Sequence, residues 1–171
     1  MAQPMSDERV VALQREYGLS YHVPYALQAE ELVGLRGKRV LEVGGSLPEG
    51  FARDALGAAQ WIAVEEMSYW GALPSLSDGS RPAEVPIRRL VEGTNPADLR
   101  TYEVLNGDVE DLPAGLEGHF DLVFSIAAFE HILRMSLAPD RMRAPLRSGG
   151  WLCTLFSPIW SAHDGHHLPM V

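Results

Sequence analysis

Apolar residues recur along the chain in short runs, each with the length of a strand or of one helix face. Between Val10 and Tyr17 they recur at helical spacing. Ser6 precedes this run as a cap residue and Gly18 follows it, so one helix is predicted there. A second helix is predicted over residues 24–34, because proline is tolerated in a first helical turn.

Five further runs are rich in β-branched and apolar residues and stop at glycine or polar residues. They predict strands over residues 40–43, 61–65, 102–105, 120–125 and 151–156. Strands that alternate with helices favour right-handed crossovers and a mostly parallel sheet. The pattern therefore predicts an α/β fold.

The segments between these strands are predicted in less detail. Helices are expected over residues 51–56 and 127–137, with Pro139 breaking the second, and a further helical turn over residues 142–146. Residues 67–100 are expected to form an extended connection, in which the apolar residues from Ile87 to Val91 make one short amphipathic helix or turn.

Composition narrows the class of protein. The chain has 171 residues, 46% of them hydrophobic, which suits one domain with a single core. No apolar run approaches the roughly 20 residues that cross a bilayer, and residues 1–9 contain no apolar signal core, so we expect a cytoplasmic protein. The single cysteine, Cys153, lies in an apolar run and is expected to be a small buried hydrophobe.

Charge argues against one class of partner. The net charge is −9, and basic residues gather only in two short groups, Arg88-Arg89 and residues 141–147. Tight binding to a phosphate backbone needs many basic contacts. Nucleic acid is therefore not the expected substrate, and no membrane association is expected either.

Glycines and polar residues follow the predicted strands, at the sheet edge where parallel sheets hold their ligands. Gly44 and Gly45 would let the backbone approach a ligand closely. Glu65 follows them by about 20 residues, and a carboxylate there suits a ribose diol. Asp108 can accept a hydrogen bond from an adenine amino group, and Val109 offers the ring an apolar face.

Four segments resemble, in order, the motifs of class I S-adenosylmethionine-dependent methyltransferases. They are residues 40–46 for the first motif, 106–113 for the adenine-contacting segment, 120–131 for the fourth-strand motif and 146–152 for the approach to the fifth strand. Each motif is weak by itself, but four with compatible spacing support one another. The resemblance implies a Rossmann-like three-layer αβα sandwich, with a helical cap over residues 1–35 and an S-adenosylmethionine-binding domain over residues 36–171.

The same resemblance implies S-adenosylmethionine as the cofactor. The residues that would surround its methionine part are Glu42, Gly44, Gly45 and Ser46. Glu65 would bind its ribose, and Asp108 with Val109 its adenine. Ser125, at the end of the fourth strand, completes the expected cofactor-binding set.

The chain departs from the family in two places. Ser46 and Pro48 stand where the family usually has further glycines, which would narrow the turn. The chain also ends at Val171, too soon for the family's usual C-terminal strand pair. Because an open sheet edge is usually covered, we expect a second copy, a partner chain or the tail to cover the fifth strand.

Histidines are the candidates on the acceptor side, where methyl transfer needs mainly in-line alignment and sometimes a base. His131 follows the fourth strand and is one candidate base, or it simply orders a helix with Glu130. His163, His166 and His167 could supply a base, bind a divalent metal, form a polar loop facing the acceptor, or lie on a surface. No metal site is predicted.

Three functions remain open from the sequence. The first is methyl transfer to a small-molecule acceptor. The second is a catalytically degenerate S-adenosylmethionine-binding or structural subunit that supports a partner. The third, a nucleotide-dependent oxidoreductase, is disfavoured because no Gly-x-Gly-x-x-Gly follows the first strand.

Overall fold

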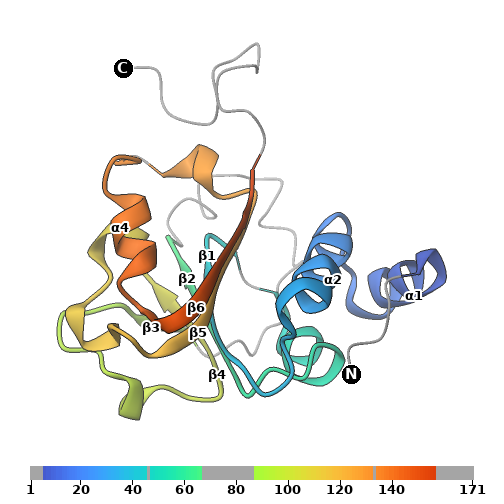
Figure 1. Cartoon of the computed structure of the whole chain (residues 1–171), viewed down its shortest axis with the longest axis horizontal. Coiled ribbons are helices and arrows are strands. Elements are labelled where there is room, and N and C mark those ends of the chain that lie inside the picture. Colours follow the sequence, from blue (N-terminus) through green and yellow to red (C-terminus); the bar gives the residue numbers. More distant parts are fainter. Residues whose placement is uncertain (1–5, 46, 67–86, 133, 157–171) are drawn as a thin grey trace.

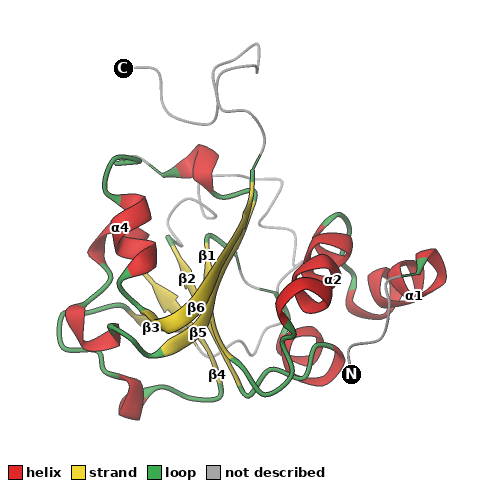
Figure 2. Cartoon of the chain, viewed as in Figure 1, coloured by secondary structure: helices red, strands yellow, loops and turns green. Residues whose placement is uncertain are grey.

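A central sheet organises the chain, with helices on both of its faces (Figures 1 and 2). The computed structural model describes residues 6–45, 47–66, 87–132 and 134–156. In the described part the sheet has six strands in the order β3-β4-β2-β1-β5-β6. They are β1 (Arg39–Val43), β2 (Gln60–Glu65), β3 (Ile87–Arg89), β4 (Tyr102–Asn106), β5 (Phe120–Ile126) and β6 (Leu146–Leu155).

Every pairing between these strands is parallel, so the predicted sheet type is confirmed. The chain runs outward from β1 through β2 to the edge strand β3, comes back to β4 beside β2, and then crosses to the other side of β1, where β5 lies. The strand order therefore reverses between β1 and β5. In open α/β sheets such a reversal opens a crevice at the carboxyl ends of the strands, where ligands bind.

The two N-terminal helices form where the sequence predicts them. Ser6 caps α1 (Asp7–Tyr17) by accepting a hydrogen bond from the Arg9 amide at 3.3 Å, and Gly18 ends the helix in the left-handed region with φ 65°. The second helix, α2 (His22–Val33), starts two residues before Pro24, which lies in its first turn.

Two apolar layers cover the two faces of the sheet. On one face α2 packs Val23 and Leu27 against residues of β1, β2 and β5, together with the π-helical turn Phe51–Ala55. On the other face α4 (Ala138–Arg143) buries Met142 among residues of the same strands and the turn that follows β4. Figure 2 shows α2 and α4 on opposite sides of the sheet, as expected for a three-layer αβα sandwich.

The helix expected over residues 127–137 does not form. The backbone of Ala127 has φ 51°, outside the right-handed helical region, and only a short 3-10 turn follows at Phe129–His131. Helical structure resumes at Ala138 with Pro139 in the first turn of α4. Proline lacks an amide hydrogen, which a first turn does not need, so Pro139 begins a helix here instead of breaking one.

Two strand assignments also change. The predicted helix or turn between Ile87 and Val91 is wrong, because Ile87–Arg89 pairs with β4 as strand β3. The fifth predicted strand, β6, begins at Leu146, five residues before Trp151. An irregularity in the β5–β6 register between Phe120 and Leu122 accommodates this longer start.

Among the described helices, none combines the length and the apolar character that crossing a membrane requires.

Candidate functional site

The carboxyl ends of the parallel strands bring the predicted site residues to one edge of the sheet. Val43 and Val64 are partners in the β1–β2 register, and Glu65 pairs with Asn106 in the β2–β4 register. The amide of Gly44 donates to the carbonyl of Val64 at 2.9 Å. The loops after β1, β2 and β4 therefore start side by side.

Gly44 and Gly45 are required by packing within the protein itself. Gly44 has φ 70°, and a Cβ there would lie 2.1 Å from the Cβ of Ala128, in the segment after β5. A Cβ on Gly45 would lie 2.4 Å from the Glu42 Oε1 atom. Both distances are too short for real atoms, so a larger residue at Gly44 would displace the backbone around it, and one at Gly45 would displace the Glu42 carboxylate. The third predicted loop residue, Ser46, lies outside the described residues.

The side chain of Glu42, on strand β1, is hydrogen-bonded to the glycine loop that follows this strand. Its Oε2 atom accepts hydrogen bonds from the Trp61 indole Nε1 at 2.7 Å and from the Leu47 amide at 3.0 Å. The side chain is buried, and this burial raises the pKa of Glu42 to about 7 despite the two hydrogen bonds that lower it; the nearby charge of Glu65 raises it further. Its described contacts are thus with the loop backbone and the indole.

Glu65 and Asp108 are the two other predicted carboxylates at this edge. Glu65 is the last residue of β2 and is buried, and its carbonyl accepts from the Gly107 amide at 3.0 Å. Asp108 lies two residues after the end of β4 and is exposed. Partial desolvation and the neighbouring charges of Glu110, Glu66 and Asp111 raise the pKa of Asp108. Asp108 and the backbone of Glu65 therefore lie close together.

Val109 and Ser125 take interior positions. Val109 is 5% exposed and packs in the core with residues of β1 and β2. Ser125, at the end of β5, is 1% exposed and donates from Oγ to the Val43 carbonyl at 2.9 Å. This bond joins the end of β5 to the end of β1, across the reversal in strand order.

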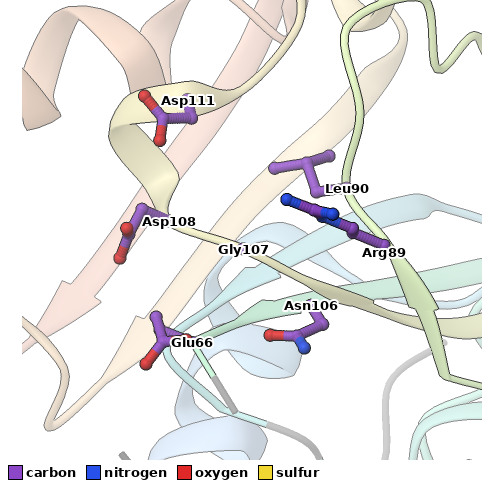
Figure 3. A pocket seen from close by; sticks show the side chains of 7 residues that line it. All are labelled: Glu66, Arg89, Leu90, Asn106, Gly107, Asp108 and Asp111. Carbon is purple, nitrogen blue, oxygen red and sulfur yellow. The ribbon is translucent and has the colours of Figure 1, made fainter. Parts of the chain in front are cut away.

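A pocket of about 320 Å³ opens at the carboxyl ends of β3 and β4 (Figure 3). The described residues that line it are Glu66, Arg89, Leu90, Asn106, Gly107, Asp108 and Asp111. Of these, only Asp108 belongs to the site predicted from the sequence. In the sequence, Arg89 stands out only as part of the short basic pair Arg88-Arg89. It was not predicted as a site residue because the strand that carries it was not predicted.

The side chain and amide of Arg134 join two loops. Arg134, in the turns after β5, donates from its amide to Glu110 Oε1 at 2.8 Å and from its guanidinium to Asp111 Oδ1 at 3.1 Å. Glu110 is 4% exposed by its side chain, whereas Asp111 is largely exposed. Arg134 also opposes the rise in the pKa of Asp108. The loop after β4 is therefore held by the segment after β5.

The histidines of the acceptor side are only partly described. His131 ends the 3-10 turn after β5 and is exposed. In the same turn, the ring of Phe129 stacks on that of Phe156 at a centroid distance of 4.8 Å. The other three candidates, His163, His166 and His167, lie outside the described part of the chain. Within the described part, no group of three potential ligand side chains is placed to hold a metal ion.

Comparison with known proteins identifies a family over part of the chain. Residues 84–154 match the methyltransferase domain family. No curated protein sequence matches the chain.

Two solved structures are similar to the chain. One belongs to the complex between the Trm112 methyltransferase activator of Haloferax volcanii and a protein assigned as a methyltransferase. It has a TM-score of 0.51 and 20% identity, and the match covers 86% of this chain and 56% of that one. The other is an S-adenosylmethionine-dependent methyltransferase from Mesorhizobium loti, with a TM-score of 0.45 and 14% identity over 75% of this chain and 49% of that one. The chain spans about half the length of these proteins, and the first likeness shows the shared fold.

Proposed function

We propose that the protein binds S-adenosylmethionine and transfers its methyl group to a small molecule, since residues 84–154 match the methyltransferase domain family. The resemblance to class I methyltransferases predicted from the four sequence motifs is confirmed by that match. The acceptor and the individual site residues are part of the proposal.

One observation carries this proposal. Glu65 and Asp108 stand at the ends of two neighbouring parallel strands, next to a pocket of about 320 Å³. A nucleoside offers hydroxyl donors on its ribose and an amino donor on its adenine. Two carboxylates on adjacent strand ends suit those donors, and a carboxylate near the ribose disfavours a 2′-phosphate. The donor and acceptor chemistry therefore fits S-adenosylmethionine.

The remaining cofactor residues are proposed on the same basis. Gly44, Gly45 and Ser46 would accommodate the methionine part, with Glu42 fastening their loop. Val109 would contribute to the apolar surroundings of the adenine, and Ser125 would keep the end of β5 against β1. The bound cofactor supplies a methyl group on a sulfonium, a good leaving group, so the protein mainly aligns the acceptor and excludes water.

The acceptor is proposed to be small. A net charge of −9 disfavours nucleic acid, because a phosphate backbone repels such a surface. His131, His163, His166 and His167 are proposed as bases for an acceptor that must lose a proton. For an acceptor that must lose a proton, single alanine variants at these positions would lower kcat more at low pH than at high pH, because at high pH the acceptor loses its proton to solvent. For an acceptor that needs no base, the variants would leave kcat unchanged.

Calorimetric titration tests the cofactor proposal. The wild-type chain should bind S-adenosylmethionine and S-adenosylhomocysteine with micromolar affinity and should not bind NAD. Glu65→Ala should weaken both by at least about tenfold, because a hydrogen bond to a charged group is lost. Glu117→Ala is the matched control, since it removes an exposed carboxylate. Absence of binding to the wild-type chain would reject the proposal.

A non-catalytic role beside a partner is the second candidate, and one observation favours it. The edge strand β6 and the residue after it expose Trp151, Leu152, Leu155 and Phe156. Sheet edges with apolar side chains are usually covered. A solved structure of the same fold comes from a complex with an activator protein. A second copy or a partner chain on β6 is therefore proposed, and a monomer that remains active and free of aggregation would reject it.

A further inference from the structure

Arg89 is the one cation among the described residues that line the pocket between β3 and β4. Figure 3 shows its side chain directed into the pocket, with Glu66, Asp108 and Asp111 on the side that it faces. One wall of this pocket therefore offers hydrogen-bond donors and the other offers acceptors.

The position of Arg89 is set by backbone pairing. Arg89 pairs with Asn106 in the parallel β3–β4 register, and the next amide, of Leu90, donates to the Asn106 carbonyl at 2.9 Å. Leu90 packs so closely on Gly107 that a Cβ there would lie 2.8 Å from the Leu90 Cβ. The end of β3 is thus held against the start of the loop that carries Asp108.

The two neighbouring arginines of β3 have different partners. Arg88 forms an ion pair with the buried carboxylate of Glu103, with 3.4 Å between Nε and Oε1. Successive side chains of a strand point to opposite faces, so Arg89 projects away from that pair. In the described part of the chain, no carboxylate oxygen lies within 4.0 Å of a guanidinium nitrogen of Arg89. Its donors are therefore available to a ligand.

An adenine edge has the complementary pattern. Its exocyclic amino group is a donor, and the ring nitrogens beside that group are acceptors. Asp108 can accept from the amino group, while the planar guanidinium of Arg89 can donate to a neighbouring ring nitrogen. Hypoxanthine would place a carbonyl oxygen against the carboxylate, so the same pair would disfavour it.

We propose that Arg89 recognises the adenine base of the cofactor by donating a hydrogen bond to a ring nitrogen, next to the amino group that donates to Asp108. The inference rests on the proposed function, since it requires that the nucleoside binds beside Asp108. It assigns to β3, the strand absent from the sequence-based expectation, the role of selecting the base.

The experiment compares ligands that differ in one ring nitrogen. S-adenosylhomocysteine and its 1-deaza and 7-deaza analogues are titrated into the wild-type chain and into Arg89→Met. The wild-type chain should bind one of the two analogues about tenfold more weakly than the parent ligand, the cost of one hydrogen bond to a charged group. Arg89→Met should bind the parent ligand about tenfold more weakly and should no longer distinguish that analogue.

Two further variants separate charge from geometry. Arg89→Lys keeps the charge but loses the planar array of donors, so it should recover only part of the affinity. Arg100→Met removes an exposed arginine just before β4, at the opposite end of the sheet, and should bind like the wild-type chain. Because Arg89 is exposed, all three variants should keep the thermal stability of the wild-type chain.

Three results would overturn the inference. They are unchanged affinity in Arg89→Met, a loss of affinity that leaves the discrimination between analogues intact, and full recovery by Arg89→Lys, which would leave only a charge effect. If the wild-type chain binds no S-adenosylhomocysteine, the proposed function itself fails, and that result is distinguishable because it appears before any variant is compared.

Discussion

The indole of Trp61 donates a hydrogen bond of 2.7 Å to the carboxylate of Glu42, inside the sheet and beneath the glycine loop. The two residues are 19 positions apart and belong to neighbouring strands. They meet because Trp61 is the register partner of Val40, and Glu42 lies two residues farther along the same face. The indole of Trp61 thereby fixes the buried carboxylate of Glu42, which in turn accepts from the amide of Leu47 in the glycine loop.

The stability of the protein should depend on pH through Glu42. Its pKa is about 7 in the folded chain and about 4.5 for the free group, so the folded state binds this proton more tightly than the unfolded state. The contribution of Glu42 to stability is therefore complete below about pH 4.5 and falls as the pH rises through 7. The loss is on the order of 3 kcal/mol. Urea denaturation between pH 5 and pH 8 measures it.

Glu42→Gln is the variant that isolates this effect. Its single amide oxygen can take the place of Oε2 and accept from both Trp61 and the Leu47 amide, so the loop contacts persist. The variant should lose most of the decline in unfolding free energy between pH 5 and pH 8. An unchanged decline would assign the pH dependence to other groups.

Gly44→Ala should be strongly destabilising, because the new methyl group would meet the side chain of Ala128. Gly37→Ala is its matched control, since Gly37 has φ 74° and no atom within 4 Å of its Cβ position. The control should cost about 1–2 kcal/mol from the left-handed backbone alone. Gly44→Ala should cost about 1–3 kcal/mol more. Chemical denaturation of both variants tests this, and equal losses would contradict the close contact.

Ser125→Ala should destabilise the chain by about 1–3 kcal/mol, because it removes the donor to the Val43 carbonyl and leaves that carbonyl buried. Ser136→Ala, at an exposed position, should change the unfolding free energy by less than about 0.5 kcal/mol. Urea denaturation of the two variants provides the comparison. If they behave alike, the bond between the ends of β5 and β1 contributes nothing measurable.

Arg134→Met and Asp111→Asn should differ although they affect the same cluster. Asp111 is largely exposed, so losing its ion pair should cost less than about 1 kcal/mol. Arg134→Met removes the guanidinium from both carboxylates, although its backbone amide still donates to Glu110, so it should cost more than Asp111→Asn. It should also raise the pKa of Asp108, which an NMR titration would follow. A larger loss in Asp111→Asn would show that the exposed pair is the important one.

Sequence patterns predicted the elements whose signals are local. The cap at Ser6, the stop at Gly18 and the apolar run of β5 each lie within a few residues of the structure that they determine. The parallel sheet followed from the alternation of such runs. The placing of Glu65 at the end of β2 and of Asp108 after β4, at the same edge, followed from the rule that parallel strands end at one edge.

Features set by contacts between distant segments were not predicted. Strand β3 has only three residues, too few for a periodic signal. It forms because the outer edge of β4 is free to pair with it. The helix expected after β5 had suitable apolar spacing, but the positive φ of Ala127, beside the Gly44 loop, turns the chain away. The bond between Trp61 and Glu42 depends on strand register, which no single segment contains.

The bond between Ser125 and Val43 also has a consequence for how the chain is made. The two residues lie 82 positions apart in the chain. Strand β5 pairs with β1 along one of its two sides. At about 5–20 residues per second, a ribosome releases β1 several seconds before β5. During that interval β1, one of the two central strands, lacks its neighbour on one side. Synthesis of this protein therefore includes a period in which an apolar, incompletely paired segment depends on chaperones or on rapid elongation to avoid misassembly.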